Sequence, residues 1–166
     1  DMPNGTLVIA ERQQGGRGRM GRRWNSPEGG IWLSVILRPE LSPTDAPKLT
    51  IMAAVAVAES IFQSTGIQTN IKWPNDILVD GKKICGILTE ISAELDIINY
   101  VIIGIGINVN NDKFPDELKD KSISLKQIKG EKVNRVKVLA SLLERLESYY
   151  FKAERDGFEE ILERWR

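Results

Sequence analysis

The sequence predicts one α+β domain, because strand-like and helix-like segments are segregated along the chain. Two apolar runs come first, a long apolar helix follows, a cluster of strands comes next, and two helices close the sequence. That order is typical of α+β folds rather than of a regular alternation of strands and helices. A length of 166 residues is that of one domain, and the sequence contains no internal repeat.

The first two strands are predicted at residues 7–10 and 31–37, where apolar residues run together. Residues 11–30 lie between them and hold six glycines and five arginines, a composition typical of a loop. Loops longer than about 12–15 residues are usually functional or disordered, so this segment is a candidate site.

A mostly buried helix is predicted after the second strand. Thr44 or Asp45 is expected to cap its start, with Pro47 in the first turn. Gly66 is expected to end it, just beyond Ser64. One face of this helix is expected to carry Ile51, Met52, Val55, Ala58 and Phe62.

A hairpin is predicted next, because Asp80-Gly81 stands between apolar runs at 77–79 and 83–91 and favours a type I′ turn. Residues 100–109 are expected to form another strand, and residues 111–130 a polar loop.

Two helices are predicted to close the chain, an amphipathic one over residues 134–156 and a short one after the break at Gly157. Their apolar faces are expected to carry Val136, Leu139, Leu143, Leu146 and Tyr150 in the first, and Phe158, Ile161, Leu162 and Trp165 in the second.

Composition excludes several kinds of chemistry. The chain has no histidine, which removes the Ser-His-Asp triad and every His-ligated metal. Its one cysteine, Cys85, rules out an internal disulfide and fits a cytoplasmic location. No apolar run is long enough to cross a membrane. The 23 basic and 23 acidic residues cancel, so attraction to a polyanion or a membrane would need a local patch.

Residues 13–24 form such a patch. From Glu11 to Trp24, five arginines stand against one glutamate, a local charge of +4. Guanidinium groups bind phosphate and carboxylate through paired hydrogen bonds, and glycines let a backbone approach a ligand closely. The segment lacks the Gly-Lys-Ser/Thr ending of a Walker loop. Taken alone, it is also compatible with a solvated flexible loop or with binding of single-stranded nucleic acid.

Three later segments offer polar groups beside strands. Asn75 and Asp76 follow Lys72-Trp73-Pro74 at the mouth of a strand. Strand alternation is expected to place Lys83 and Cys85 on one face, with Ile84 and Gly86 on the other. Cys85 is expected to be a small core residue, since no base partner is apparent.

The third of these segments is the strand Gly104-Ile105-Gly106-Ile107, which is followed by Asn108. Its glycines indicate a close approach of another group to the backbone. Each of the three segments also has a plain structural explanation when it is taken alone: a turn with a packed tryptophan, a lysine in solvent and a tightly packed central strand.

Together and in this order, these segments resemble the catalytic domain of biotin protein ligases. The matching stretches are GRGRMGRRW, KWPND, KKICGIL and GIGINVN, with GGIWLSVIL between the first two. The similarity covers nearly the whole chain. It implies a fold related to class II aminoacyl-tRNA synthetases, with a mixed β-sheet backed by helices.

The resemblance also implies two reactions. The carboxylate of biotin attacks the α-phosphate of Mg-ATP and gives biotinyl-5′-AMP and pyrophosphate. A lysine of a biotin carboxyl carrier domain, in acetyl-CoA carboxylase or a related carboxylase, then takes the biotinyl group. ATP and biotin are therefore the expected substrates, Mg²⁺ is expected with ATP, and no metal site is assigned to the chain itself.

Residue roles follow from the same resemblance. Arg19 and Lys83 would be the catalytic cations, with Lys83 on the biotin carboxylate and the phosphate and Arg19 on the phosphate. The biotin side would comprise Gln13 on the ureido group, Arg17, Gly18 and the backbone near Gly86. The nucleotide side would comprise Arg22 on the ATP phosphates, Trp24 on the adenine, Asn75, Asp76 and Asn108. Asp76 would orient either the carrier lysine or a metal.

The loop over residues 12–23 is expected to be mobile without ligand and to close over the adenylate, which water would otherwise hydrolyse. Residues 1–166 are expected to form one catalytic domain. The family's N-terminal biotin-contact segment, its small β-barrel domain and any DNA-binding domain are expected to lie outside this chain. A homodimer is a further expectation from the family.

Two alternatives stay open from the sequence. One is a related lipoate or octanoate ligase, although recognition of a ureido group by Gln13 has no use for lipoate. The other is nucleic-acid binding through the Arg/Gly loop without catalysis, which would depend steeply on salt and would not need Lys83.

Overall fold

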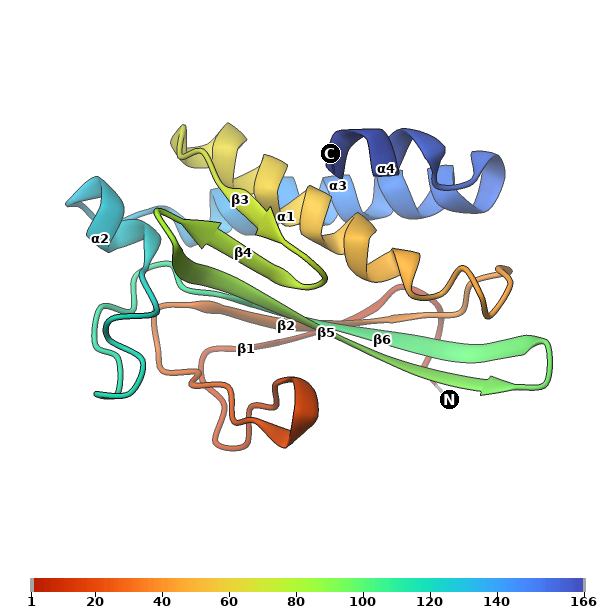
Figure 1. Cartoon of the computed structure of the whole chain (residues 1–166), viewed down its shortest axis with the longest axis horizontal. Coiled ribbons are helices and arrows are strands. Elements are labelled where there is room, and N and C mark those ends of the chain that lie inside the picture. The colour runs from red at the N-terminus through yellow and green to blue at the C-terminus, as the bar shows by residue number, and fades with distance from the viewer. Residues whose placement is uncertain (1, 166) are drawn as a thin grey trace.

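A computed structural model describes residues 2–165 and shows a six-stranded sheet with helices packed on one face (Figure 1). The strand order is β1-β2-β6-β5-β4-β3. The strands are β1 (Thr6–Ala10), β2 (Ile31–Leu37), β3 (Asn70–Lys72), β4 (Asp76–Val79), β5 (Lys82–Glu94) and β6 (Ile97–Ile107). The helices are α1 (Lys48–Thr65), α2 (Leu125–Lys129), α3 (Arg135–Asp156) and α4 (Glu159–Trp165), with a 3-10 turn, η1 (Arg19–Gly21).

The α+β class is confirmed, and the expectation of a mixed sheet is corrected in one respect. Every pairing between the named strands is antiparallel. The strand order gives the reason. Helix α1 connects β2 to β3, which run in the same direction, but β6, β5 and β4 lie between them. The crossover therefore creates no parallel neighbours, and the named parallel contact is a single bridge between Lys83 and Ser122.

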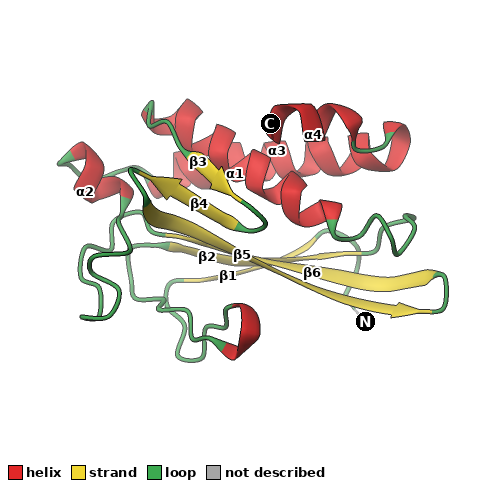
Figure 2. Ribbon diagram, in the orientation of Figure 1, coloured by secondary structure: helices red, strands yellow, loops and turns green. Residues whose placement is uncertain are grey.

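The two faces of the sheet have different coverings (Figure 2). Helices α1, α3 and α4 lie on one side, and the loop that contains η1 lies on the other. The core fills the helix side, where Val101, Ile103 and Ile107 of β6 are fully buried. The loop side is left open between strands and loop. No helix among residues 2–165 is long and apolar enough to cross a membrane.

Helix α1 is mostly buried, as predicted, but its start and its buried face differ from the prediction. Pro47 occupies the cap position and no side chain caps the helix; the carbonyl of Asp45 accepts the Lys48 N–H instead. Phe62 is 49% exposed, whereas Leu49 and Ile61 are fully buried. Because alanines and other apolar residues of α1 occur on most sides of the helix, its apolar pattern does not single out one face.

Helix α3 begins as predicted, with the Asn134 side chain accepting the Lys137 N–H. The expected face is again partly wrong, since Leu142 is fully buried and Val136 is 74% exposed. The buried face of α3 is thus rotated about the helix axis relative to the predicted face. A polar cluster on the helix side accounts for this rotation. Glu59 of α1 is paired with Arg145 of α3 and with Arg164 of α4 (3.2 Å), and it accepts the Tyr149 hydroxyl (2.6 Å).

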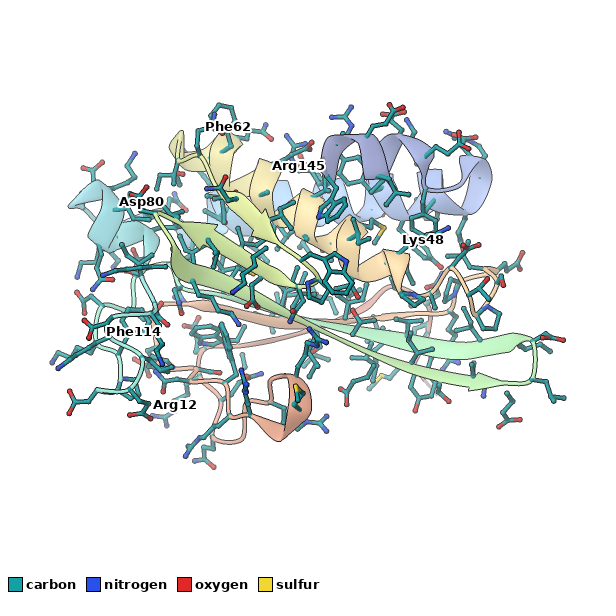
Figure 3. All side chains as sticks on the ribbon, in the orientation of Figure 1. Arg12, Lys48, Phe62, Asp80, Phe114 and Arg145 are labelled. Carbon is teal, nitrogen blue, oxygen red and sulfur yellow. The ribbon has the colours of Figure 1, made fainter. Side chains whose placement is uncertain are left out.

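Figure 3 shows Arg145 among the helices, on the opposite side of the sheet from Arg12 and Phe114. Burial, together with the hydrogen bond to Glu59, raises the pKa of Tyr149 to about 12. The phenol therefore stays protonated and keeps donating to the carboxylate at neutral pH.

The remaining elements are close to expectation. The Asp80-Gly81 turn has positive φ at both residues, as a type I′ turn requires. Gly66 and Gly157 end α1 and α3 as predicted. Strands β5 and β6 are longer than expected and join in a hairpin that extends beyond the other strands (Figure 1).

Two short elements were not predicted, strand β3 and helix α2. Helix α2 lies within the expected polar loop and starts with a capping box between Ser124 and Gln127.

We predict that Leu142→Ala lowers the free energy of unfolding by about 2–5 kcal/mol, because it leaves a cavity between α1 and α3. Leu143→Ala removes the same atoms from a half-buried side chain and should cost about 1 kcal/mol. Urea denaturation of both variants measures the difference. Equal losses would show that α3 is rotated toward the face that the sequence pattern favours.

Candidate active site

The loop side of the sheet holds a cavity of about 710 Å³, within the range of small-molecule sites. Strands β2, β5 and β6 supply its floor, and residues 13–25 supply its opposite wall. Every residue that the sequence singled out for chemistry lines this cavity: Gln13, Arg17, Gly18, Arg19, Arg22, Trp24, Asn75, Asp76, Lys83, Gly86 and Asn108. The structure thus brings together residues that are far apart in the sequence.

The floor of the cavity depends on glycine. Gly86 of β5 and Gly106 of β6 lie opposite each other and under the indole of Trp24. A Cβ at Gly106 would lie 2.4 Å from Trp24 Nε1, and one at Gly86 would lie 2.8 Å from the same ring. The close approach expected at the glycines of β6 is therefore present at Gly106, where the approaching group is a side chain of the loop. It is absent at Gly104, where a Cβ would make only ordinary contacts.

A β-bulge decides which side of the sheet Lys83 faces. Lys83 pairs with Leu78 and Cys85 pairs with Ile77, so Ile84 is an extra residue in β5. Strict alternation predicted Lys83 and Cys85 on one face, and this is wrong because the bulge shifts the alternation by one residue. Lys83 lies in the cavity, where its Cε would be 3.2 Å from a Cβ at Gly86.

Cys85 lies in the hydrophobic core, as predicted. Burial raises the pKa of its thiol well above the usual range and outweighs the opposing effect of the Lys83 charge. The group therefore stays a neutral thiol at physiological pH and is not a nucleophile.

The ammonium group of Lys83 has two close neighbours. Asp76 Oδ1 lies 2.7 Å from Lys83 Nζ, as an ion pair whose angles fall outside hydrogen-bond geometry. The ring of Trp24 lies 5.0 Å from the same nitrogen, within range of a cation–π interaction. The Lys83 backbone is also held, because its N–H donates to Lys121 O (2.8 Å) and its carbonyl accepts the Ile123 N–H (3.0 Å).

Two arginines of the loop reach across to the sheet. Arg19 Nη1 donates to Asn75 Oδ1 (3.1 Å), and Arg17 Nη2 pairs with Glu90 Oε2 (3.2 Å). The second pair is well exposed, with side-chain exposures of 73% and 42%, so it contributes little to stability. Both contacts connect the loop to the opposite rim of the cavity.

Within the loop, two isolated bridges join Gln13 to Ser26 and Arg17 to Arg23. The backbone N–H of Trp24 donates to Gly16 O (2.8 Å), and the backbone N–H of Gly18 donates to Arg22 O (2.7 Å). These bonds define one closed arrangement of the loop. The mobility expected for residues 12–23 without ligand stays a prediction.

Gln13 and Asn108 both have protein partners. Gln13 Oε1 accepts a hydrogen bond from Ser26 Oγ (2.9 Å). Asn108 is 3% exposed; its Nδ2 donates to Lys83 O (3.4 Å) and its Oδ1 accepts from Asn111 Nδ2 (3.0 Å). Asn108 therefore also supports the backbone of Lys83.

The cavity concentrates positive charge in a neutral chain. Seven cationic side chains and three carboxylates line it, a net charge of +4. Asp76 and Glu90, two of the three carboxylates, are paired with Lys83 and Arg17. Such a cavity favours an anionic ligand. Among residues 2–165, no group of three His, Cys, Asp or Glu side chains is arranged to hold a metal ion.

Some lining residues were missed from the sequence. Glu90 continues the alternation of Gly86 and Leu88 along β5, so strand periodicity could have found it. Phe114, Leu118, Asp120, Lys121 and Ser122 also line the cavity, but they come from a segment without a periodic pattern. Ser26 supports the site through hydrogen bonds to Gln13 and to the Trp24 carbonyl, and Asn111 supports it through Asn108.

Comparison with known proteins identifies the family of the chain. The family model described as "Biotin/lipoate A/B protein ligase family" matches residues 1–108. The chain belongs to the biotin/lipoate A/B protein ligase family. It is 54% identical over 166 residues to the bifunctional ligase/repressor BirA of Bacillus spizizenii, covering 98% of this chain and 51% of that protein. It is 31% identical to BirA of Escherichia coli, with 99% and 52% covered. The chain thus spans about half the length of these relatives.

Solved structures of the family share the fold. Biotin protein ligase from Aquifex aeolicus in complex with biotin and ATP superposes with a TM-score of 0.88 at 34% identity, covering 99% of this chain and 68% of that one. Biotin protein ligase from Leishmania major in complex with biotinyl-5-AMP has a TM-score of 0.77 at 23% identity. At that lower identity the likeness concerns the fold alone.

We predict that Gly106→Ala displaces Trp24 from the floor of the cavity and costs about 1–3 kcal/mol of unfolding free energy, because the new methyl group overlaps the indole. Near-UV circular dichroism reports the movement of the ring. Gly104→Ala is the matched control on the same strand: its Cβ would be 3.5 Å from Leu88 O, an ordinary contact, and its cost should stay within about 0.5 kcal/mol. Indistinguishable spectra for the two variants would contradict the packing of Trp24 on Gly106.

Proposed function

We propose that this chain forms the catalytic core of a biotin protein ligase, which activates biotin with ATP and transfers it to a lysine of a carrier protein. The observation that supports this most is the cavity of net charge +4. In it, Arg19 contacts Asn75, and Lys83 contacts the next residue, Asp76. Biotin carboxylate and ATP repel each other, so their reaction needs fixed positive charge at the place where they meet.

In the first step, a carboxylate oxygen of biotin forms a bond to the α-phosphorus of ATP, and the bond from that phosphorus to the bridging oxygen breaks. Pyrophosphate leaves with the electron pair. Arg19 and Lys83 are proposed to stabilise the charge that spreads over the phosphate oxygens. Arg22, on the same loop, is proposed to hold the departing phosphates together with Arg19.

In the second step, the amine of the carrier lysine attacks the carbonyl carbon of biotinyl-5′-AMP. A carbon–nitrogen bond forms, the bond from that carbon to the phosphate oxygen breaks, and AMP leaves; the proton that the amine loses passes to water. Asp76 lines the cavity next to Lys83 and is proposed to orient the incoming lysine.

The other lining residues are proposed to bind the two substrates. Gln13, Arg17, Gly18 and Gly86 form the proposed biotin side, with Gln13 on the ureido group. Asn108 is proposed to contact the nucleotide. Trp24 is proposed to pack on the adenine.

Mg²⁺ is proposed to enter with ATP as part of the substrate. Magnesium commonly uses substrate phosphates, water and one or two carboxylates, and Asp76 and Asp120 are carboxylates in the cavity wall. The carrier partner, a homodimer and a cytoplasmic location remain predictions from the resemblance.

The experiment that tests this function measures adenylate formation by residues 1–166. Mg-ATP labelled at the α-phosphate is incubated with biotin, with lipoate or with neither acid. We predict an acyl-AMP that requires biotin. An adenylate formed with lipoate alone would favour the lipoate ligase alternative, and binding of single-stranded nucleic acid without any adenylate would favour the nucleic-acid alternative.

We predict that Lys83→Ala and Arg19→Ala each slow adenylate formation by about 10²–10³-fold, the usual effect of losing one preorganised donor to a developing oxyanion. Lys82→Ala is the matched control, since it removes the neighbouring positive charge outside the cavity lining. Far-UV circular dichroism checks that all three variants fold. Parental rates in both cavity variants would contradict the proposed roles of the cations.

A further inference from the structure

Two consecutive residues hold the two proposed catalytic cations, and they hold them differently. Asp76 Oδ1 lies 2.7 Å from Lys83 Nζ, and Asn75 Oδ1 accepts a hydrogen bond of 3.1 Å from Arg19 Nη1. The partner of the lysine carries a negative charge, and the partner of the arginine carries none. Lys83 is therefore compensated, whereas Arg19 keeps its full charge.

Arg17 is the third cationic residue of the cavity wall that contacts another side chain, and it shows the same contrast with Arg19. Arg17 pairs with a carboxylate, Glu90. Within residues 2–165, no carboxylate oxygen lies within 4 Å of the Arg19 guanidinium. Of these three held cations, Arg19 alone has a neutral partner.

The orientation of the Asn75 amide is fixed by the sheet. Its Nδ2 donates to Ile87 O (2.8 Å), and the Ile87 N–H donates back to the backbone carbonyl of Asn75 (3.0 Å). These two bonds leave the amide oxygen, and not the amide nitrogen, facing Arg19. Both ends of the side chain thus have a protein partner, and the amide oxygen is the end that meets Arg19.

We propose that Asn75 is a positioning residue whose neutrality leaves the charge of Arg19 available to phosphate. The amide oxygen holds the guanidinium in place across the cavity without cancelling its charge. A carboxylate at this position would hold Arg19 more tightly, because charge-assisted hydrogen bonds are roughly twice as strong, and would compete with an incoming phosphate. This inference rests on the proposed function, which makes the phosphates of ATP the ligand.

The substitution Asn75→Asp tests the proposal, because it keeps the size and the acceptor oxygen and adds a charge. It also removes the Nδ2 donor to Ile87 O, and Asn75→Ala removes the same donor without adding a charge. We expect it to weaken binding of inorganic pyrophosphate, measured by calorimetry, and to raise the KM for ATP in adenylate formation, each by about tenfold, the effect of about 1.4 kcal/mol. Asn75→Ala should have the smaller effect on both, since it frees Arg19 but leaves its charge. A role in packing alone predicts the reverse order.

Two controls separate the proposed route from simpler ones. Asn70→Asp adds the same charge at an exposed position of β3 outside the cavity lining, and it should leave pyrophosphate binding unchanged. In an Arg19→Gln background, Asn75→Asp should weaken pyrophosphate binding less than twofold, because the residue through which it acts is gone. A tenfold loss in that background would mean direct repulsion of the ligand and would overturn the proposal.

The remaining outcomes distinguish this inference from the proposed function. A parental chain that forms biotinyl-AMP while Asn75→Asp behaves identically overturns the inference and leaves the function standing. A parental chain that forms no adenylate but loses pyrophosphate affinity on Asn75→Asp contradicts the function and supports the role of Asn75 in keeping Arg19 available to phosphate. A parental chain that neither forms adenylate nor binds pyrophosphate overturns both.

Discussion

The β-bulge in strand β5 determines which side of the sheet the Lys83 side chain faces, and the rest of the candidate site depends on that position. Ile84 shifts the alternation of the strand, so Lys83 faces the open side of the sheet and Cys85 faces the helices. Without this bulge, strand alternation would direct the ammonium group into the apolar core, where an unpaired charge is very costly. With it, the lysine meets Asp76 and Trp24 in the cavity on the loop side of the sheet.

The remaining features of the site can be understood from that position. Lys83 and Trp24 stack over the floor only because Gly86 and Gly106 present no side chain there. The loop that carries Trp24 then crosses the cavity and brings Arg17 and Arg19 to the opposite rim, where Glu90 and Asn75 meet them. Helices on the other face supply the core, so the loop side is free to be polar, glycine-rich and positively charged.

Local patterns in the sequence were sufficient to predict most of the fold. Apolar runs, an Asp-Gly turn and helix-ending glycines are short-range signals, and the elements they predicted are present. Helix faces were harder, because α1 is apolar nearly all round and α3 is oriented by a polar cluster centred on Glu59. Strand β3 has only three residues, too few for a periodic pattern, whereas the capping box of α2 was visible in the sequence.

The candidate site could be predicted as a set of residues but not as a set of contacts. Its members came from four segments that resemble one family, and they do line one cavity. The contacts between them join residues 56 and 73 positions apart, Arg19 with Asn75 and Arg17 with Glu90, and no local pattern encodes such pairs. The bulge is equally invisible, because it is a property of the register between two strands rather than of either strand alone.

The central claim is that Arg19 and Lys83 together hold the phosphate that joins biotin to the nucleotide. A crystal structure of this chain with biotinyl-5′-AMP tests it most directly. The account predicts that the adenylate occupies the cavity between the loop and the strand glycines, with both cations in contact with oxygens of the acyl phosphate. An adenylate bound elsewhere, or one bound in the cavity with neither cation touching its phosphate, would contradict it.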